Sequence, residues 1–293
     1  MKNKKYLIIN ADDFGMSSEF NQAICCLMTK GIVSSTSLMA NGRAYEEAIR
    51  DIHKYELKKI GVHLTLTCDG FQNSNKITYS SITHANSLED KNGILFCSYQ
   101  ELAANASDED IINEIYSQII KIKNDGIEFT HIDNHMYSVI HYLGLRGYEC
   151  LYKALHRLKL NRKVGFRHAL RKYDIDGIRS VYPGRKIQPY AWAMNLFFNL
   201  RCPDYVFTIP YTSPQSDSVE QKCNLLNTFF SNIKNGISEL HVHPAVFSEE
   251  LRNRNPTWKD RINEFEALNC YSEKLLMDKY GITLISYADL NNI

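Results

Sequence analysis

The sequence lacks the features that mark membrane-spanning or exported proteins. No stretch of the chain approaches the roughly 18 consecutive apolar residues that a membrane span needs. The first residues are basic, but the apolar run after them is too short for a signal peptide and has no small-residue cleavage site. We therefore expect a globular protein with no membrane span and no export signal.

Paired cysteine motifs and a strong net charge are also missing. The eight cysteines are scattered and form no C-x-x-C pair, which favours reduced thiols and a cytoplasmic protein over a disulfide or zinc framework. The 34 basic and 33 acidic residues leave a formal net charge of +1, which gives no electrostatic case for binding nucleic acid or an anionic membrane.

What the sequence does contain is an alternation of short apolar runs and helical patterns. The runs predict strands at 6–10, 32–39, 59–67, 127–133, 163–167, 204–209, 239–243 and 282–286. The helical patterns cover 20–28, 44–55, 107–124, 147–160, 190–200, 218–232 and 261–280. No glycine-rich phosphate fingerprint follows the first strand, which counts against a dinucleotide fold. We predict an α/β protein, a distorted (β/α) TIM-like barrel, with residues 1–293 in a single domain.

Two segments interrupt this alternation. Residues 68–106 are rich in Asn, Ser and Asp and show little periodicity, so we interpret them as a long loop over the active-site face, with a lid as one option. The basic and aromatic segment 168–201 is expected to be a variable part of the side that binds a ligand. Its Tyr173, Tyr182, Tyr190 and Trp192 could stack on the rings of that ligand, although aromatic residues of such a segment are more often core residues.

An acidic pair directly follows the first strand. Asp12 and Asp13 come after the apolar run Tyr6–Asn10, and side chains alternate along a strand, so the two carboxylates must point in different directions. One could hold a metal ion while the other faces a substrate or a water molecule. Two Asp residues after a strand can also simply form a turn and cap the next helix.

Histidines stand at the ends of three further predicted strands. His63 lies in the third strand, His131 and His135 lie around the end of the fourth, and His241 and His243 lie in the seventh. Each one alone could be a buried structural histidine. The carboxyl ends of parallel strands meet at one edge of a sheet, so four polar clusters at that edge indicate a site.

The chemistry of these residue types is that of a metal-dependent hydrolase. One carboxylate and two neutral imidazoles suit a divalent ion such as Zn, Ni, Co or Fe and leave positions for water and substrate. A spare carboxylate could take a proton from the water, and a spare histidine could protonate the leaving amine.

Several motifs resemble those of the YdjC-like carbohydrate deacetylase family, which includes the chitooligosaccharide deacetylases. They are NADDFGMS at 10–17, GIVSSTSLMANG at 31–42, GVHLTLT at 61–67, SLEDKNGILF at 87–96, THIDNH at 130–135, HVHPA at 241–245 and GITLISYADL at 281–290. The resemblance covers the chain except for roughly 140–235. It implies a metal-dependent hydrolase that removes the acetyl group from an N-acetylated sugar, with one divalent ion (Zn, Mg, Ni or Co), and it suggests a homodimer.

The resemblance also implies roles for individual residues. Asp13, His63 and His135 would bind the metal ion, Asp12 would be the general base, and His243 would be the acid or the oxyanion partner. The supporting residues are His131, expected to orient His135 or Asp13; Arg167, expected to support the base; and His241, placed beside the site or the substrate.

This sequence departs from the family pattern after the third ligand. Met136 and Tyr137 follow His135 where the family usually continues with histidines, which puts the substrate contacts in doubt. Two other functions remain open: another metallohydrolase or a two-histidine-one-carboxylate oxygenase, and a non-catalytic sugar-binding protein with the same fold. Retention of Asp12 beside Asp13 argues against the non-catalytic protein, because binding alone does not require the second carboxylate.

Overall fold

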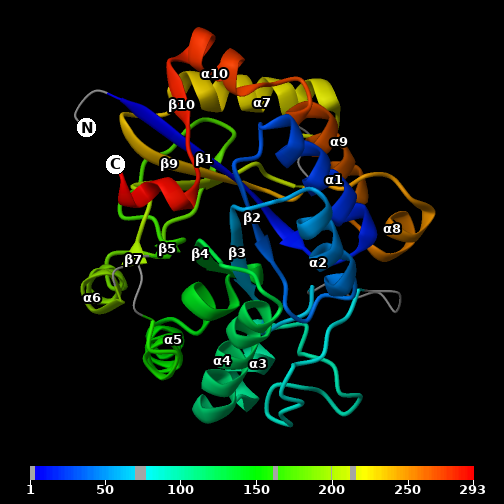
Figure 1. Cartoon of the computed structure of the whole chain (residues 1–293), viewed down its shortest axis with the longest axis vertical. Coiled ribbons are helices and arrows are strands. Elements are labelled where there is room, and N and C mark those ends of the chain that lie inside the picture. The colour runs from blue at the N-terminus through cyan, green and yellow to red at the C-terminus, as the bar shows by residue number, and fades with distance from the viewer. Residues whose placement is uncertain (1–3, 70–76, 161–163, 199, 212–215) are drawn as a thin grey trace.

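The computed structural model describes residues 4–69, 77–160, 164–198, 200–211 and 216–293. A sheet runs through the middle of the molecule and helices surround it (Figure 1). The strands are β1 (Lys5–Phe14), β2 (Ser35–Leu38), β3 (Ile60–Leu64), β4 (His131–Asn134), β5 (Val164–Phe166), β6 (Arg179–Ser180), β7 (Leu200–Arg201), β8 (Tyr205–Thr208), β9 (Gly236–Val242) and β10 (Ile282–Leu284).

The helices alternate with these strands, as the sequence predicts. They are α1 (Ser18–Lys30), α2 (Tyr45–Lys54), α3 (Tyr99–Asn105), α4 (Asp108–Asn124), α5 (Leu145–Arg157), α6 (Gln188–Phe198), α7 (Val219–Asn232), α8 (Glu249–Arg254), α9 (Trp258–Leu268) and α10 (Glu273–Tyr280). None of the described helices is long and apolar enough to cross a membrane. The eight cysteines, all of which lie in the described residues, form no disulfide.

The sheet has the order β6-β8-β9-β1-β2-β3-β4-β5-β7 and curls like part of a barrel. Every pairing along it is parallel except that of β6 with β8. β10 pairs with the first residues of β1 rather than taking a place at the end of the order. The fold is therefore a single α/β domain of the distorted TIM-like class, with β6 and β7 at the two ends of the sheet.

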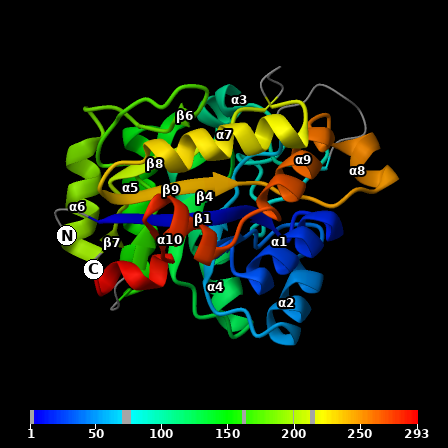
Figure 2. The ribbon, with the colours of Figure 1, turned by 90° about the horizontal axis from the view of Figure 1, so that it is seen from above.

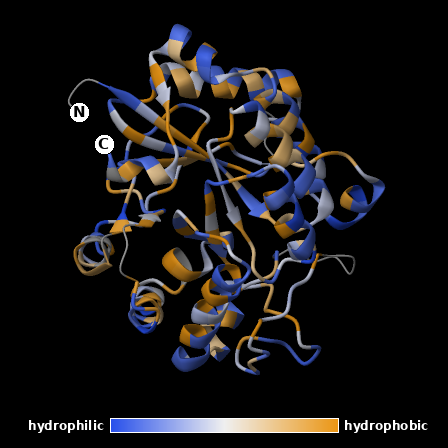
Figure 3. Cartoon of the chain, viewed as in Figure 1, coloured by the Kyte–Doolittle hydropathy of each residue, from blue (hydrophilic) through white to orange (hydrophobic). Residues whose placement is uncertain are grey.

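The hydrophobic core lies between the sheet and its helices. Figure 3 shows apolar residues concentrated on the central strands, with polar residues on the outer sides of the helices. The view from above shows α7 lying along β8 and β9, and α1 and α2 lie on the other side of β1 (Figure 2). Strand β1 is buried from Leu7 to Phe14, and burying such apolar side chains stabilises the fold by roughly 1.5–3 kcal/mol each.

Four predicted elements need correction. The first strand continues beyond Asn10 to Phe14, so Asp12 and Asp13 lie within β1 rather than after it. The single helix at 261–280 is two helices, because Ser272 caps α10 by accepting a hydrogen bond from the Leu275 N–H group. The fourth strand begins at His131, so residues 127–130 precede it. The segment 68–106 is not simply a loop: it contains α3 and buries Tyr79, Leu88 and Leu95. Residues 70–76 of the proposed lid lie outside the described residues.

Candidate metal centre and catalytic site

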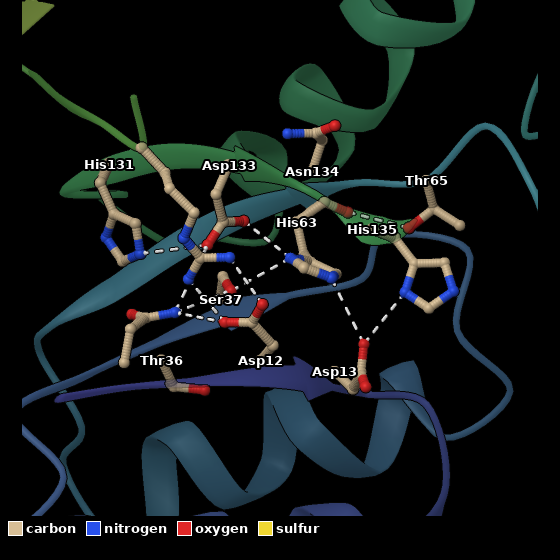
Figure 4. A network of polar contacts seen from close by, with 12 residues as sticks. Asp12, Asp13, Thr36, Ser37, His63, Thr65, His131, Asp133, Asn134 and His135 are labelled. Carbon is tan, nitrogen blue, oxygen red and sulfur yellow. Dashed lines mark hydrogen bonds and ion pairs between the residues drawn. The ribbon is translucent and has the colours of Figure 1, made fainter. Parts of the chain in front are cut away.

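Strand β1 delivers its two carboxylates to different neighbours. Asp13 has a left-handed backbone, with φ of +69°, and Gly15 follows with φ of +91°. A non-glycine residue with this conformation is uncommon and marks a tight, functionally constrained turn. Asp13 faces His63 and His135, and Asp12 lies on the same side of β1 next to Asp133, because the left-handed backbone at Asp13 brings both carboxylates to one face (Figure 4).

One oxygen of Asp13 is the meeting point of two imidazoles. Its Oδ1 atom lies 3.3 Å from His63 Nε2 and 3.1 Å from His135 Nδ1, and all three side chains are almost completely buried. His63 comes from β3, and His135 follows β4 directly. These residues form one of the groups whose ligand atoms lie close enough together to hold a metal ion.

The outer nitrogen of each imidazole faces a second carboxylate. His63 Nδ1 donates to Asp133 Oδ1 at 2.7 Å, and His135 Nε2 lies 3.1 Å from Asp69 Oδ1. A neutral His63 that donates from Nδ1 presents the lone pair of Nε2 to Asp13, so two acceptors face one another. A cation or a proton must lie between them, and a carboxylate behind a ligating histidine is the usual support of a metal site. The residues present therefore fit a divalent ion.

Two other groups could in principle hold a metal ion, and both contain Asp12. One adds His241 and His243 to it, and the other adds His63 and Asp133. Both oxygens of Asp12 accept hydrogen bonds from Arg167, each at 2.6 Å. A guanidinium at that position repels a cation and occupies the oxygen lone pairs, so the group centred on Asp13 is the better candidate.

Arg167 is bound by three buried carboxylates. Besides Asp12, it lies 2.9 Å from Asp133 Oδ2 and donates from Nε to Glu239 Oε1 at 2.8 Å. Burial alone would raise the pKa of Asp12, but Arg167 outweighs it and holds that pKa well below its usual range. Burial raises the pKa of Glu239 to about 7 despite its contact with Arg167. Asp12 is therefore anionic at neutral pH.

His243 lies opposite Asp12, with its Nε2 atom 3.8 Å from Asp12 Oδ2. Its Nδ1 atom makes a short hydrogen bond with the hydroxyl of Tyr211. Glu264 accepts hydrogen bonds from the His243 backbone N–H at 2.6 Å and from the Tyr211 hydroxyl at 3.3 Å. Burial, followed by the charge of Arg261, lowers the pKa of His243 to about 4, so this histidine is neutral at pH 7.

The remaining two histidines lie next to the site rather than in it. His241 Nε2 is hydrogen-bonded to the hydroxyl of Tyr137 at 2.7 Å. His131 stacks on Tyr287 with ring centroids 4.1 Å apart, and its Nε2 atom lies 3.9 Å from Asp133. The acidic neighbour of His131 is thus Asp133, and among the described contacts it bonds neither His135 nor Asp13.

Sequence reasoning missed several of these residues. Asp133 had a usable signal, because it lies two residues from both His131 and His135 and so shares their face of the strand. Asp69 had none, since it opens a segment without periodicity. Met136 and Tyr137, which break the expected motif, both have left-handed backbones, and this turn carries the Tyr137 hydroxyl to His241.

Fold and site together define an α/β protein of the barrel type with a buried acid–histidine centre at the carboxyl ends of its strands. The family model of YdjC-like proteins matches residues 6–273, and the chain belongs to this family.

Relatives match the chain over almost its whole length. A carbohydrate deacetylase of Clostridium beijerinckii is 25% identical over 97% of this chain and 99% of its own, and one of Enterococcus faecalis is 28% identical over 99% of both. A crystal structure described as a cellobiose-phosphate cleavage protein of Enterococcus faecalis superimposes with a TM-score of 0.73 and 26% identity, over 98% of this chain and 99% of the other. An uncharacterized protein of Agrobacterium tumefaciens, 11% identical with a TM-score of 0.52 over 98% of this chain and 89% of its own, shares the fold alone.

Proposed function

We propose that this protein is a metal-dependent deacetylase that hydrolyses the N-acetyl group of a sugar or an oligosaccharide. The observation that carries the proposal is the convergence of His63 and His135 on one oxygen of Asp13, with a carboxylate behind each imidazole. The relatives named carbohydrate deacetylases supply the substrate class.

Asp13, His63 and His135 would hold the ion. A divalent ion there would polarise the acyl carbonyl and lower the pKa of a water molecule towards about 7. The remaining steps belong to Asp12 and His243, which lie beside this centre with Asp12 Oδ2 3.8 Å from His243 Nε2.

Asp12 is the proton acceptor. As the water oxygen forms its bond to the acyl carbon, a water proton passes to Asp12. The bidentate contact with Arg167 keeps the Asp12 carboxylate anionic and fixes its orientation, at the cost of base strength. Its catalytic contribution therefore comes mainly from position.

His243 acts beside Asp12, at the carbonyl oxygen of the acyl group. It is neutral at rest. The Tyr211 hydroxyl has one proton and two acceptors, Glu264 and His243 Nδ1, and in the state in which it donates to Nδ1 the proton of the imidazole is on Nε2. That N–H group can donate a hydrogen bond to the developing oxyanion. The C–N bond then breaks, the proton that Asp12 took from the water passes to the amine nitrogen, and acetate and the free amino sugar leave with Asp12 again ionised.

The test uses metal-stripped protein reloaded with Zn, Ni, Co or Mg, and measures acetate release from a panel of N-acetylated sugars. His63→Ala and His135→Ala should lose both metal and activity. Asp12→Asn should retain metal, measured by elemental analysis, and lose about 10²–10⁴ in rate. Wild-type turnover by Asp12→Asn would refute the base assignment, and metal loss in His243→Ala would make that histidine a ligand.

A further inference from the structure

Helix α6 exposes an apolar surface that no part of the described chain covers. Trp192, Leu196 and Phe197 are 69%, 66% and 66% exposed, and Pro189 is exposed as well. These four residues, here called the α6 face, are all of the described exposed residues of the helix. On its inner side the helix packs through Phe198 against Tyr152 of α5, with ring centroids 5.1 Å apart.

The neighbouring helix shows what an ordinary surface looks like in this protein. Four of the six exposed residues of α5 are polar, namely Glu149, Lys153, His156 and Arg157, and the other two are Leu145 and Tyr152. Single exposed apolar residues are common and need no explanation, but a helix whose described exposed residues are all large and apolar or proline marks an interaction surface.

The charged residues that flank α6 in the sequence all have one sign. Between Asp176 and Asp204 the sequence contains no acidic residue, and its charged residues are Arg179, Arg185, Lys186 and Arg201. Arg185 and Lys186 are exposed directly before the helix begins, and Arg201 follows its end. The overall charge of +1 hides this local excess, so the absence of a net charge does not exclude an anionic partner here.

An apolar helix face with a tryptophan and flanking basic residues has the chemistry of a helix that lies in the interface of an anionic bilayer. The apolar side chains enter the acyl boundary, and each nearby Lys or Arg contributes about 1 kcal/mol through the negative surface potential. A second copy of the chain suits the face less well, because a symmetric contact places the same basic residues opposite one another.

The α6 face is also connected to the catalytic side of the sheet. The side chain of Gln188, the first residue of the helix, donates to the carbonyl of Ala169 at 2.9 Å. Ala169 lies two residues beyond Arg167, which binds Asp12. The helix therefore starts where the carboxyl end of β5 delivers Arg167, and it lies at the edge of the molecule (Figure 2).

We propose that the α6 face docks this protein on an anionic lipid bilayer. The full-length protein should co-sediment with vesicles of phosphatidylcholine mixed equally with phosphatidylglycerol and should not bind phosphatidylcholine alone. The emission of Trp192 should shift to shorter wavelength on binding. The variant Leu196→Ser/Phe197→Ser should lose binding. Arg185→Gln/Lys186→Gln should weaken it roughly fivefold for each removed charge.

The matched control is Met277→Ser on α10, where a 45% exposed methionine lies far along the chain from α6. This variant should bind vesicles like the wild type. All variants should deacetylate a soluble sugar at the wild-type rate, so failure of docking is separable from failure of the proposed activity. One result would assign the face to a second copy and overturn the proposal. In that result the wild type binds no vesicles and is a dimer by light scattering, and Leu196→Ser/Phe197→Ser dissociates the dimer. Vesicle binding that ignores lipid charge and survives both double variants would overturn it too.

Discussion

Arg167 balances the charge of the deepest part of the site. It contacts Asp12, Asp133 and Glu239, so one guanidinium serves three carboxyl groups in a region without solvent. The rise in the pKa of Glu239 to about 7, driven by burial, relieves part of this excess. Asp13 and Asp69 lie outside the reach of Arg167 in the described contacts, and this second pair of carboxylates is where a divalent ion would supply the missing positive charge.

The hydrogen bond that His63 donates to Asp133 gives the first prediction. Asp133→Asn should lower the affinity for the divalent ion by about 10–100-fold, because the carboxylate that fixes the tautomer of His63 is replaced by a neutral amide. Competition with a chelator measures the affinity. The control is Asp174→Asn, at an exposed carboxylate paired only with Lys172. Equal affinities of the two variants would remove Asp133 from the metal centre.

The burial of His131 predicts a pH dependence of stability. Burial lowers its pKa from 6.5 to about 4. Between these two pH values His131 is therefore protonated in the unfolded chain and neutral in the folded protein. The resulting stability is present above pH 6.5 and is lost as the pH falls towards 4. When the pH is lowered from 7 to 5, the neutral burial of His131 should reduce the free energy of unfolding by about 2 kcal/mol.

Urea unfolding of metal-free protein at both pH values measures this loss. The variant His131→Gln cannot titrate, so its stability should fall by about 2 kcal/mol less than that of the wild type over the same interval. Parallel losses in the two proteins would show that His131 does not carry the effect.

For individual residues, the sequence predicts which side chains take part in the site better than it predicts which atoms they contact. Asp12, Asp13, His63, His135 and His243 are recognisable because strand ends collect at one edge of a sheet. Which nitrogen of each histidine faces which carboxylate depends on side-chain geometry across several strands, and no local pattern encodes it. Asp69 shows the limit, since only the folded chain brings it within 3.1 Å of His135.

The elements that carry the site pack closely enough to require glycine. A Cβ atom on Gly61 of β3 would lie 2.3 Å from His131 Nε2 on the neighbouring strand β4. Gly165 of β5 is equally close to Tyr287, the residue on which His131 stacks. The His131 ring therefore fits beneath the site because glycines stand on the strands at either side.

This packing predicts a rescue experiment. Gly61→Ala should destabilise the protein by about 1–3 kcal/mol, because the added methyl group overlaps the His131 ring. Gly61→Ala/His131→Ala should be destabilised by less than the sum of the two single variants, since the second substitution removes the atoms that clash. Strict additivity in a double-mutant cycle of unfolding free energies would mean that the two positions do not interact.

The boundaries of elements were predictable where capping and periodicity agree. Ser107 caps α4 as expected, through the Asp110 N–H group, and Gly31 closes α1 in the left-handed conformation. The helix predicted over 261–280 was wrong because its apolar spacing continues across the break, so only the cap at Ser272 reveals two helices. A local capping residue, rather than apolar spacing, marks such a boundary.

For the whole molecule, the alternation of strands and helices predicted the class of fold but not the closure of the sheet. β10 pairs with Lys5–Leu7 at the start of β1, and β6 and β7 are strands of two residues that the sequence does not distinguish from loop. Apolar periodicity over so few residues carries no signal. The order of strands at the ends of the sheet is therefore a property of packing that the sequence pattern does not display.

The last prediction concerns the stability of the whole fold. The candidate ligands come from β1, β3 and the turn after β4, so an ion bound by Asp13, His63 and His135 would link three strands of the sheet. An ion that binds only the folded state, at a free concentration of about 100 times its dissociation constant, stabilises the folded state by roughly 2.7 kcal/mol. For a chain of 293 residues that corresponds to a rise in melting temperature of about 4 °C. Differential scanning calorimetry of wild-type protein with and without the ion should show this rise, and His63→Ala should show almost none. A rise of the same size in His63→Ala would place the ion elsewhere in the molecule, because the loss of one of three ligands from a buried centre must weaken binding there.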